Sequence, residues 1–281
     1  MAYQKISEDV TLWYEELGPA DGKPLLSCQE GFGGDEAYMR ILAENGFHIY
    51  KIQIRGFGRS THVWEDHGEK WWDIWADDAV AFADSLGLGQ FYYVGASHGA
   101  GIGWHIAYRH PGRLSAFFGI VCGPHERGGL ETSQARWQVI QAAQSWETWH
   151  AYVKTRFPAG RPEATGKETP AELAMLQKRQ AMYDDFWNRP LESSRINPKK
   201  PFNWCKTEEE LSALISTIRV PAILLGGFKD DIATPKTMLR SASALPGAKL
   251  VLYEAAGHGL ATQFPQEVAE DILSFCRQRG L

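Results

Sequence analysis

Short apolar runs alternate along most of the chain with segments whose apolar residues recur at helical spacing. The apolar runs are bounded by turns rich in glycine, proline and aspartate, which is typical of buried strands. Strands are predicted over residues 11–16, 24–28, 48–54, 116–121, 220–225 and 249–253, with one more beginning at Tyr92.

Amphipathic helices are predicted between these runs. Residues 71–86 place apolar side chains such as Ile74, Trp75 and Phe82 at helical spacing, and residues 265–277 repeat the pattern at the end of the chain. The aspartates of the first helix are expected on its solvated face rather than in a metal site: Asp77, Asp78 and Asp84. Strands that alternate with helices in this way predict the α/β class, with a mostly parallel, doubly wound sheet covered on both faces.

The pattern changes between residues 124 and 216, where the strand signal disappears and helical, aromatic-rich sequence takes over. Residues 159–166 break this segment with glycine and proline. The aromatic residues of the segment are Trp137, Trp146, Trp149, Tyr152, Tyr183, Phe186, Trp187 and Trp204. We predict an inserted helical cap, or lid, over residues 124–216, and a core made of residues 1–123 and 217–281. Most lid aromatics are expected in its interior, with Trp137, Trp149 and Trp187 as candidates to contact the substrate.

Composition excludes several classes of protein. The chain has 281 residues and a net charge of -5, without a lysine or arginine run, so a nucleic-acid partner is not expected. No apolar stretch reaches the roughly 18 residues that a membrane span requires. The first residues lack the apolar core of a signal peptide, and the four cysteines are widely scattered. These features predict a cytoplasmic protein with reduced thiols, no metal site and no membrane contact.

The strand that begins at Tyr92 runs directly into a helix of small residues, with Ser97 at the junction. Gly95 and Gly99 flank this serine, as a sharp strand-to-helix turn requires, because a Cβ there collides with neighbouring backbone. Such a turn lifts the serine side chain clear of both elements. It also aims the first N–H groups of the helix, including that of His98, at the space beside the hydroxyl, where an oxyanion can be stabilised.

A second glycine-rich loop, residues 31–34, follows the strand at 24–28. Its position allows a backbone N–H, that of Phe32, to point toward the serine as a second oxyanion donor. The alternative is that the loop only connects a strand to a helix.

The order of these features resembles that of the α/β-hydrolase family over nearly the whole chain outside the lid. The matching parts are the loop 31–34, the turn 55–60, the elbow around Ser97, the helix end at 108–111, residues 221–230, and Gly257-His258 with the final helix. The resemblance implies a serine, an acid and a histidine in that order along the chain.

Ser97, Asp230 and His258 satisfy this order. The resemblance implies that His258 takes the proton of Ser97, that Asp230 orients the imidazole, and that the Phe32 and His98 N–H groups hold the oxyanion. Asp231 stays open as the acid because it is one residue away. Glu126 stays open because some members of the family carry the acid after the preceding strand. The remaining histidines of the elbow helix, His105 and His110, are expected to pack against it or cap it.

The chain departs from the family at Glu30, where relatives commonly have a histidine before the glycine of the oxyanion loop. An ionised carboxylate facing an oxyanion opposes it by Coulomb repulsion. Glu30 must therefore point away, be neutralised by a partner such as an arginine, or contact the substrate. Glu30 and Gly31 are accordingly named as candidate substrate-binding residues.

These features predict a cofactor-independent serine hydrolase that cleaves an ester or lactone bond of a small, fairly apolar molecule beneath the lid. The first alternative is hydrolysis of a carbon–carbon bond in a vinylogous diketone, which similar lidded relatives perform with the same three residues. Two further alternatives are a cofactor-free dioxygenase and a ligand receptor that has retained the fold. A homo-oligomer is compatible with the sequence.

Overall fold

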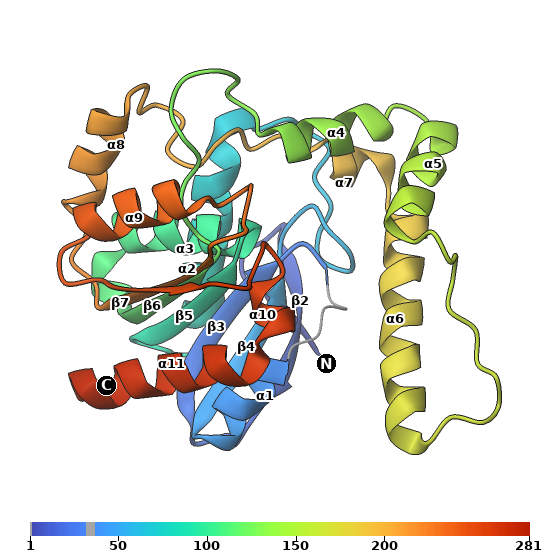
Figure 1. Cartoon of the computed structure of the whole chain (residues 1–281), viewed down its shortest axis with the longest axis horizontal. Helices are drawn as coiled ribbons and strands as arrows, with labels where there is room; N and C mark the ends of the chain where they lie inside the picture. The colour runs from blue at the N-terminus through green and yellow to red at the C-terminus, as the bar shows by residue number, and fades with distance from the viewer. Residues whose placement is uncertain (1, 32–36) are drawn as a thin grey trace.

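The computed structural model describes residues 2–31 and 37–281, and its centre is one twisted sheet (Figure 1). Within the described residues the sheet has eight strands in the order β1-β2-β4-β3-β5-β6-β7-β8. Their bounds are Ala2–Lys5 (β1), Thr11–Leu17 (β2), Lys23–Gln29 (β3), Phe47–Gln53 (β4), Phe91–Ala96 (β5), Leu114–Ile120 (β6), Ala222–Gly227 (β7) and Lys249–Tyr253 (β8).

All pairings from β4 through β8 are parallel, whereas β1 and β2 form an antiparallel edge next to β4. The predicted α/β class with a mostly parallel, doubly wound sheet is therefore confirmed. The sequence analysis missed β1, because its short polar run alternates partly exposed and exposed residues at the sheet edge and carries little apolar signal.

Both faces of the sheet are buried, as the apolar runs of the central strands require. On β5, Tyr93 faces one core, while Tyr92 and Val94 face the other. On β6, Phe117 faces the same core as Tyr93, and Phe118 faces the other core. Successive side chains of a strand point to opposite faces, so each central strand contributes to both cores.

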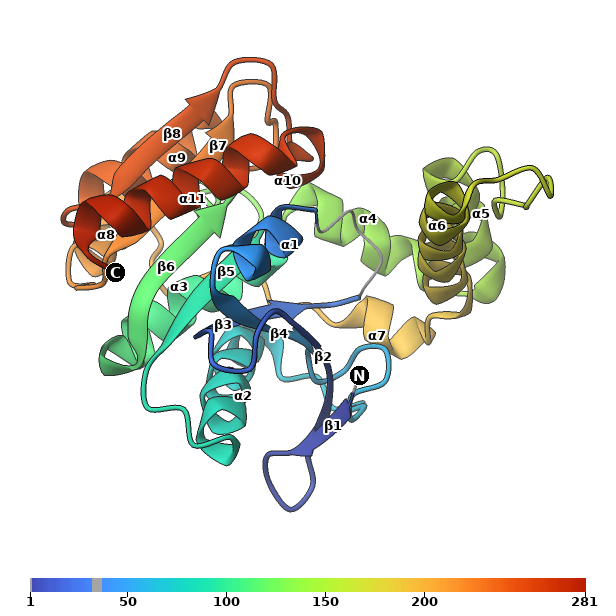
Figure 2. The same ribbon diagram turned by 90° about the horizontal axis from the view of Figure 1, so that it is seen from below.

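Helices from both ends of the chain cover the two faces (Figures 1 and 2). The first face packs against α2 (Trp71–Ser85), α3 (His98–Arg109), α8 (Glu208–Ile215) and α9 (Pro235–Ala244). The second face packs against α1 (Ala37–Glu44), α10 (Leu260–Gln263) and α11 (Pro265–Arg279). Two short 3-10 helices, Gly68–Lys70 (η1) and Pro111–Arg113 (η2), lie before α2 and after α3.

One expectation about α2 is wrong. Asp78 is not on the solvated face but is only 6% exposed, and it accepts a hydrogen bond from Nε of Arg55 at 2.9 Å. A buried carboxylate is tolerated when a guanidinium pairs with it. The pair ties α2 to the turn after β4, a contact that helical periodicity cannot reveal.

Between β6 and β7 the chain forms the predicted helical segment. It contains α4 (Gln134–Ala142), α5 (Trp146–Arg156), α6 (Pro170–Asn188) and α7 (Leu191–Arg195), followed by α8. Ala143, Trp149, Val153 and Leu191 form a small core of their own. Leu211 and Ile215 of α8 instead pack in the main core, so the separate packing unit ends before the predicted limit at residue 216.

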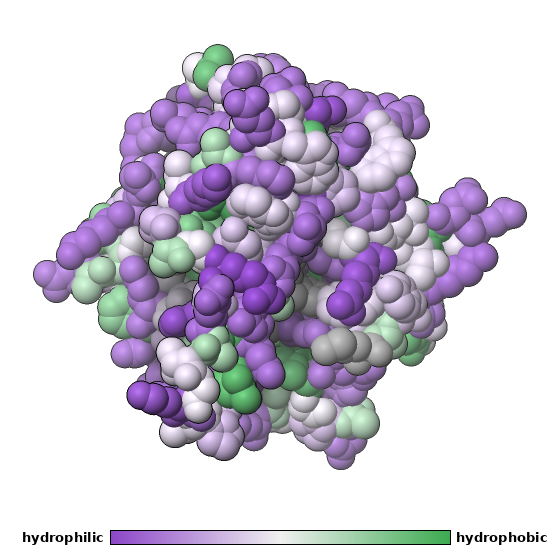
Figure 3. Space-filling model, turned by 90° about the vertical axis from the view of Figure 1, so that its right-hand side faces the viewer, coloured by the Kyte–Doolittle hydropathy of each residue, from purple (hydrophilic) through white to green (hydrophobic). Residues whose placement is uncertain are grey.

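The helices α5 and α6 stand to one side of the sheet and project from the body of the molecule (Figures 1 and 2). Each begins with a capping box, Ser145 with Thr148 and Thr169 with Glu172, which satisfies two N–H groups of the first turn. The view onto this side shows a mostly hydrophilic surface (Figure 3). Trp149 joins the two helices, because its Nε1 donates to the carbonyl of Phe186 at 2.8 Å.

The elbow helix α3 approaches the sheet closely through glycine. A Cβ added to Gly103 would lie 2.5 Å from Cε2 of Phe117 and 2.7 Å from Cε1 of Tyr93. Real Cβ atoms do not approach so closely, so the helix can lie against the rings of β5 and β6 only without a side chain at this position.

We expect Gly103→Ala to lower the free energy of unfolding by about 1–2 kcal/mol. The cost of overpacking, roughly 1–3 kcal/mol, exceeds the gain in helix propensity, which is at most about 1 kcal/mol. Gly112→Ala is the matched control, because no described atom lies within 4 Å of its added Cβ. Urea unfolding followed by circular dichroism measures both variants. Equal stabilities would contradict the close packing.

Candidate active site

Ser97 lies at the tight junction of β5 and α3 and has the left-handed backbone angles φ 50° and ψ -111°. A Cβ on Gly95 would lie 2.5 Å from the backbone of Gly99, and one on Gly99 would lie 2.5 Å from the carbonyl oxygen of Cys28. The two glycines are thus sterically required. The strained residue between them keeps its side chain exposed at the end of the sheet.

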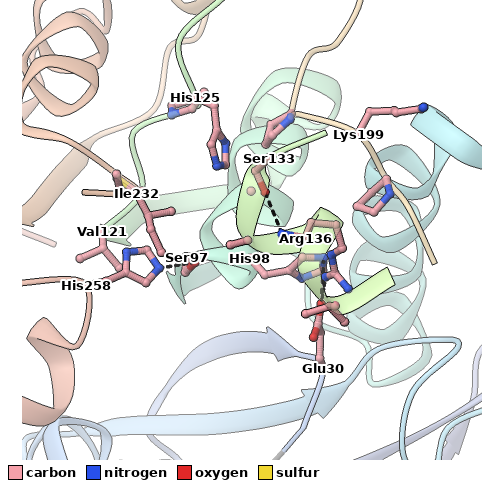
Figure 4. Close-up of a pocket in the computed structure, with 18 of the residues that line it drawn as sticks. Glu30, Ser97, His98, Val121, His125, Ser133, Arg136, Lys199, Ile232 and His258 are labelled. Atoms are coloured by element: carbon pink, nitrogen blue, oxygen red, sulfur yellow. Dashed lines mark hydrogen bonds and ion pairs between the residues drawn. The ribbon is translucent and has the colours of Figure 1, made fainter. Parts of the chain in front are cut away.

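His258 lies beside this serine, although 161 positions separate them in the sequence. Its Nε2 is 2.8 Å from Oγ of Ser97 (Figure 4). Its Nδ1 is 2.9 Å from Oδ2 and 3.0 Å from Oδ1 of Asp230. A carboxylate accepts only, so Nδ1–H donates to Asp230, and Nε2 is left to accept from the serine hydroxyl.

The sheet explains why these three side chains meet. Ser97 follows β5, Asp230 follows β7 and His258 follows β8. These strands are parallel; β7 and β8 are adjacent, and β6 lies between β5 and β7. The carboxyl ends of parallel strands lie at one edge, where loops from distant parts of the chain come together.

The side chain of Asp230 is fully buried, and its Oδ1 also accepts from the N–H groups of Ile232 at 2.8 Å and Ala233 at 3.0 Å. Burial alone raises the pKa of this carboxyl, but the bonds from His258 and from the two N–H groups outweigh burial and lower it overall. Asp230 is therefore ionised at neutral pH and holds the imidazole in one orientation.

The two alternative acids lie elsewhere. Asp231 is exposed and lines a neighbouring cavity. Glu126 is also exposed, and its carboxylate pairs with Nζ of Lys236 at 3.2 Å. Of the three candidates, Asp230 is the one whose carboxylate contacts His258.

Of the two predicted oxyanion donors, Phe32 lies outside the described residues. His98 is the first residue of α3, so its N–H has no acceptor within the helix and lies at the positive end of the helix dipole. Its side chain is buried against the rings of Trp72 and Trp75, with centroids 4.7 Å and 4.8 Å away. Burial lowers the pKa of this imidazole to about 4, so the ring is neutral at pH 7.

The departure at Glu30 is explained by arginines from the inserted helices. Its carboxylate pairs with Arg136 of α4 (Figure 4). It also lies 3.7 Å from Nη1 of Arg189, just after α6. Burial alone raises the pKa of Glu30, but the charges of Arg136, His98 and Arg189 outweigh burial and bring it to about 2. Of the three alternatives left open by the sequence, the structure has the carboxylate neutralised by arginines, and these pairs link the end of β3 to the inserted segment.

Gly31 lies beside the same charges. A Cβ there would lie 3.1 Å from Oδ2 of Asp185 and 3.3 Å from Nη2 of Arg189, the two atoms of a 2.6 Å ion pair. Glycine at this position leaves room for that pair. Gly31 is not among the residues that line the cavity beside Ser97, whereas Glu30 is.

A cavity of about 330 Å³ opens beside Ser97 and His258 and extends to the inserted helices. Of the three tryptophans named as candidates to contact the substrate, Trp149 lines this cavity, whereas Trp137 and Trp187 do not. Trp137 is 46% exposed, and Trp187 stacks on His150 with ring centroids 3.9 Å apart. The sequence analysis missed several other lining residues, because only packing decides which lid side chains face inward. They include Trp72, His125, Val139, Tyr152 and Phe186.

The two other histidines of the elbow helix make structural contacts. Nδ1 of His105 is 2.8 Å from Asp73, and its Nε2 accepts from the N–H of Phe202 at 3.2 Å. His110 lies 2.7 Å from Asp77. Both rings therefore hold α3 against its neighbours, as expected.

In the described part of the chain, no three His, Cys, Asp or Glu side chains come together as metal ligands would. None of the described helices combines the length and apolar character of a membrane span. The four cysteines, all within the described residues, are buried free thiols.

A serine on a tight strand-to-helix turn, bonded to a histidine that contacts a buried aspartate, is the arrangement of α/β hydrolases. The model of the family described as "alpha/beta hydrolase fold" matches residues 24–263. The chain belongs to this family.

Relatives of the chain carry several names. It is 24% identical to the bifunctional esterase/perhydrolase DCH of Acinetobacter calcoaceticus, over 99% of this chain and 100% of that protein. It is 25% identical to a non-heme chloroperoxidase of Burkholderia pyrrocinia, over 98% of this chain and 99% of that one. The enol-lactonase structure from Burkholderia xenovorans LB400 superposes with a TM-score of 0.68 at 20% identity, over 98% of this chain and 100% of that one. The structural likeness shows a shared fold.

We expect Glu30→Gln to destabilise the protein by about 2 kcal/mol at pH 7. This is less than the free energy that corresponds to the full difference between the folded and unfolded pKa, because the carboxylate is 22% exposed. The folded-state pKa is depressed, so the stabilisation is complete above the unfolded pKa of about 4.5 and is lost as the pH falls toward 2. The difference between wild type and variant should thus shrink between pH 5.5 and pH 3.

Urea titrations at pH 7, 5.5 and 3 measure this difference. Glu44→Gln, at an exposed position at the end of α1, is the control and should show little effect at any of the three pH values. A Glu30→Gln deficit that is equal at pH 7 and pH 3 would show that the carboxylate is not held ionised by the arginines.

Proposed function

We propose that the chain is a serine hydrolase that cleaves an ester or lactone bond of a small molecule through an acyl-enzyme. The observation that carries the proposal is the continuous chain of hydrogen bonds from Oγ of Ser97 through His258 to the buried Asp230, at the wall of a cavity. The names of relatives that include an esterase and an enol-lactonase support the same class of reaction.

In the proposed reaction, Oγ of Ser97 attacks the carbonyl carbon while Nε2 of His258 takes its proton. The negative charge that develops on the carbonyl oxygen is stabilised by the N–H of His98 at the start of α3. His258 then gives the proton to the leaving oxygen, and the C–O bond breaks. Water activated by the same imidazole attacks the acyl-enzyme and restores Ser97. Asp230 stabilises the imidazolium in both halves.

The size and lining of the cavity support a small substrate. Its volume of about 330 Å³ is at the lower end of the range for small-molecule sites. Trp149, Val139 and Phe186 of the inserted helices give it an apolar wall opposite Ser97. We therefore propose that the segment around α4 to α7 acts as the lid that selects the substrate. The proposed reaction needs no cofactor.

We expect Ser97→Ala to lower kcat/KM for 4-nitrophenyl butyrate at least a thousandfold, because it removes the nucleophile. A fluorophosphonate probe should label wild type at Ser97, as peptide mapping would show, and should not label the variant. Ser85→Ala, on the exposed end of α2, is the control and should keep full activity. Turnover of dienoate substrates and not of aryl esters would favour carbon–carbon hydrolysis instead. Active protein that no probe labels would contradict the acyl-enzyme.

Asp230→Asn should lower kcat on the order of a thousandfold or more, because an amide cannot stabilise the imidazolium and disturbs the histidine tautomer. The matched variants are Asp231→Asn and Glu126→Gln, which remove a carboxylate from an exposed position and should stay within about threefold of wild type. The three kcat values decide which acid supports His258. A larger loss in either control than in Asp230→Asn would reassign the acid.

A further inference from the structure

His125 is a partly buried histidine whose ring nitrogens have no hydrogen-bond partner in the described structure. It lies in the loop between β6 and α4, and both ring nitrogens are buried without a hydrogen-bond partner. The ring lines the cavity beside Ser97 and also a neighbouring cavity of about 790 Å³. Figure 4 shows it pointing from the backbone into the space between Ile232 and Ser133. Buried polar groups are almost always hydrogen-bonded, so this ring is suited to a partner that the cavity receives.

The charges around the ring are cationic. Burial, together with the charges of four basic side chains around the ring, lowers the pKa of His125 to about 4. These side chains are Lys200, Arg127, His258 and Arg240. The Nζ of Lys200 donates to the carbonyls of Glu126 at 2.9 Å and Gly128 at 3.1 Å, and the Nη2 of Arg127 donates to the carbonyl of Pro201 at 2.8 Å. Carbonyls do not cancel a full charge, so the potential at the ring is positive.

Glu208 and Glu126, two carboxylates near His125, are already paired, whereas Asp231 is exposed and lines the neighbouring cavity. Glu208 accepts from the guanidinium of Arg240 and from the backbone N–H of Arg127. Glu126 is exposed and pairs with Lys236. Neither lines the cavity beside Ser97, so the positive potential at the ring remains available to a ligand.

The other charged side chains that line the cavity beside Ser97 also give it a net positive charge. Its ionisable lining, apart from the histidines, consists of four cations and one carboxylate: Arg136, Arg156, Arg189, Lys199 and Glu30. Arg136 and Arg189 are occupied by Glu30 and Asp185. Lys199 is paired with Glu131 at 4.0 Å, whereas Arg156, at the end of α5, adds positive charge, so an anionic molecule fits the cavity better than a cationic one.

We propose that the substrate carries a carboxylate in addition to its ester or lactone bond, and that His125 binds this carboxylate. The inference rests on the proposed hydrolase function and names its substrate class: half-esters or lactones of dicarboxylic acids. A neutral imidazole offers one N–H donor to the carboxylate, and the bound anion favours uptake of a proton by the ring.

The test compares two 4-nitrophenyl esters of similar size, the hydrogen glutarate and the pentanoate. Wild type should prefer the glutarate half-ester in kcat/KM. His125→Leu should reduce this preference about tenfold or more, as expected for loss of a hydrogen bond to a charged group, chiefly through KM. His125→Gln, which keeps an N–H donor, should retain part of the preference. Arg156→Gln removes a cavity-lining cation without touching the ring of His125, and it should reduce the preference less than His125→Leu does.

Three results would overturn the proposal: a wild-type preference for the pentanoate, a preference unchanged in His125→Leu, or a preference lost in Arg156→Gln but kept in His125→Leu. Near-ultraviolet circular dichroism checks that each variant is folded. If His125→Leu does not fold, the comparison of wild type with His125→Gln decides, because an unchanged KM for the half-ester would then contradict the role.

Binding of glutarate to Ser97→Ala separates this inference from the proposed function. Calorimetry in two buffers of different ionisation enthalpy should show binding with proton uptake, and His125→Leu in the same background should weaken it about tenfold. If wild type hydrolyses neither ester but glutarate still binds through His125, the hydrolase function fails while the carboxylate site stands. If both esters are hydrolysed and glutarate binding does not depend on His125, the reverse holds.

Discussion

The close contact between the start of α3 and the sheet is the constraint on which the site depends. Glycine at 95 and 99 lets the helix begin within one residue of the end of β5, with a Cβ position only 2.5 Å from the carbonyl of Cys28. Ser97 is then forced to φ 50°, and its hydroxyl is held where the loops after β7 and β8 end. The strain at one residue is maintained by the packing of the whole helix, through Gly103, against β5 and β6.

A second level of organisation is electrostatic, and it connects the sheet to the inserted helices. Glu30 at the end of β3 is held ionised by Arg136 and Arg189, which come from opposite ends of the inserted segment. The neutral ring of His98 lies 3.5 Å from the same carboxylate. The position that departs from the family pattern thus serves as an attachment point between the two parts of the molecule, and its charge is balanced before a substrate arrives.

The sequence predicts the architecture well, because alternation of apolar runs and helical spacing reports burial on each element directly. Ser97, and the loops carrying Asp230 and His258, follow from the steric needs of the elbow and from the order of residues in the family. The contacts made by Asp78, Arg136 and Trp187 do not follow, because a residue pattern says how an element is buried and not what packs across from it. Asp78 is buried by an arginine from another loop, and Trp187 is covered by His150 instead of facing the cavity.

The sheet edge and the inserted helices α4 to α7 pack in separate cores, and this division separates two kinds of property. The positions of Ser97, His258 and Asp230 are fixed by the main core, whereas Trp149 and Val153 belong to a core that the sheet does not share. Substitutions in α4 to α6 can therefore change the shape and charge of the cavity without moving Ser97, His258 or Asp230. His125 lies where the two parts meet, on the loop that leaves β6 toward α4. A side chain at this junction starts from a loop of the sheet and lines the cavity that the inserted helices complete, so it can contact a molecule in the cavity without being one of the three hydrogen-bonded residues.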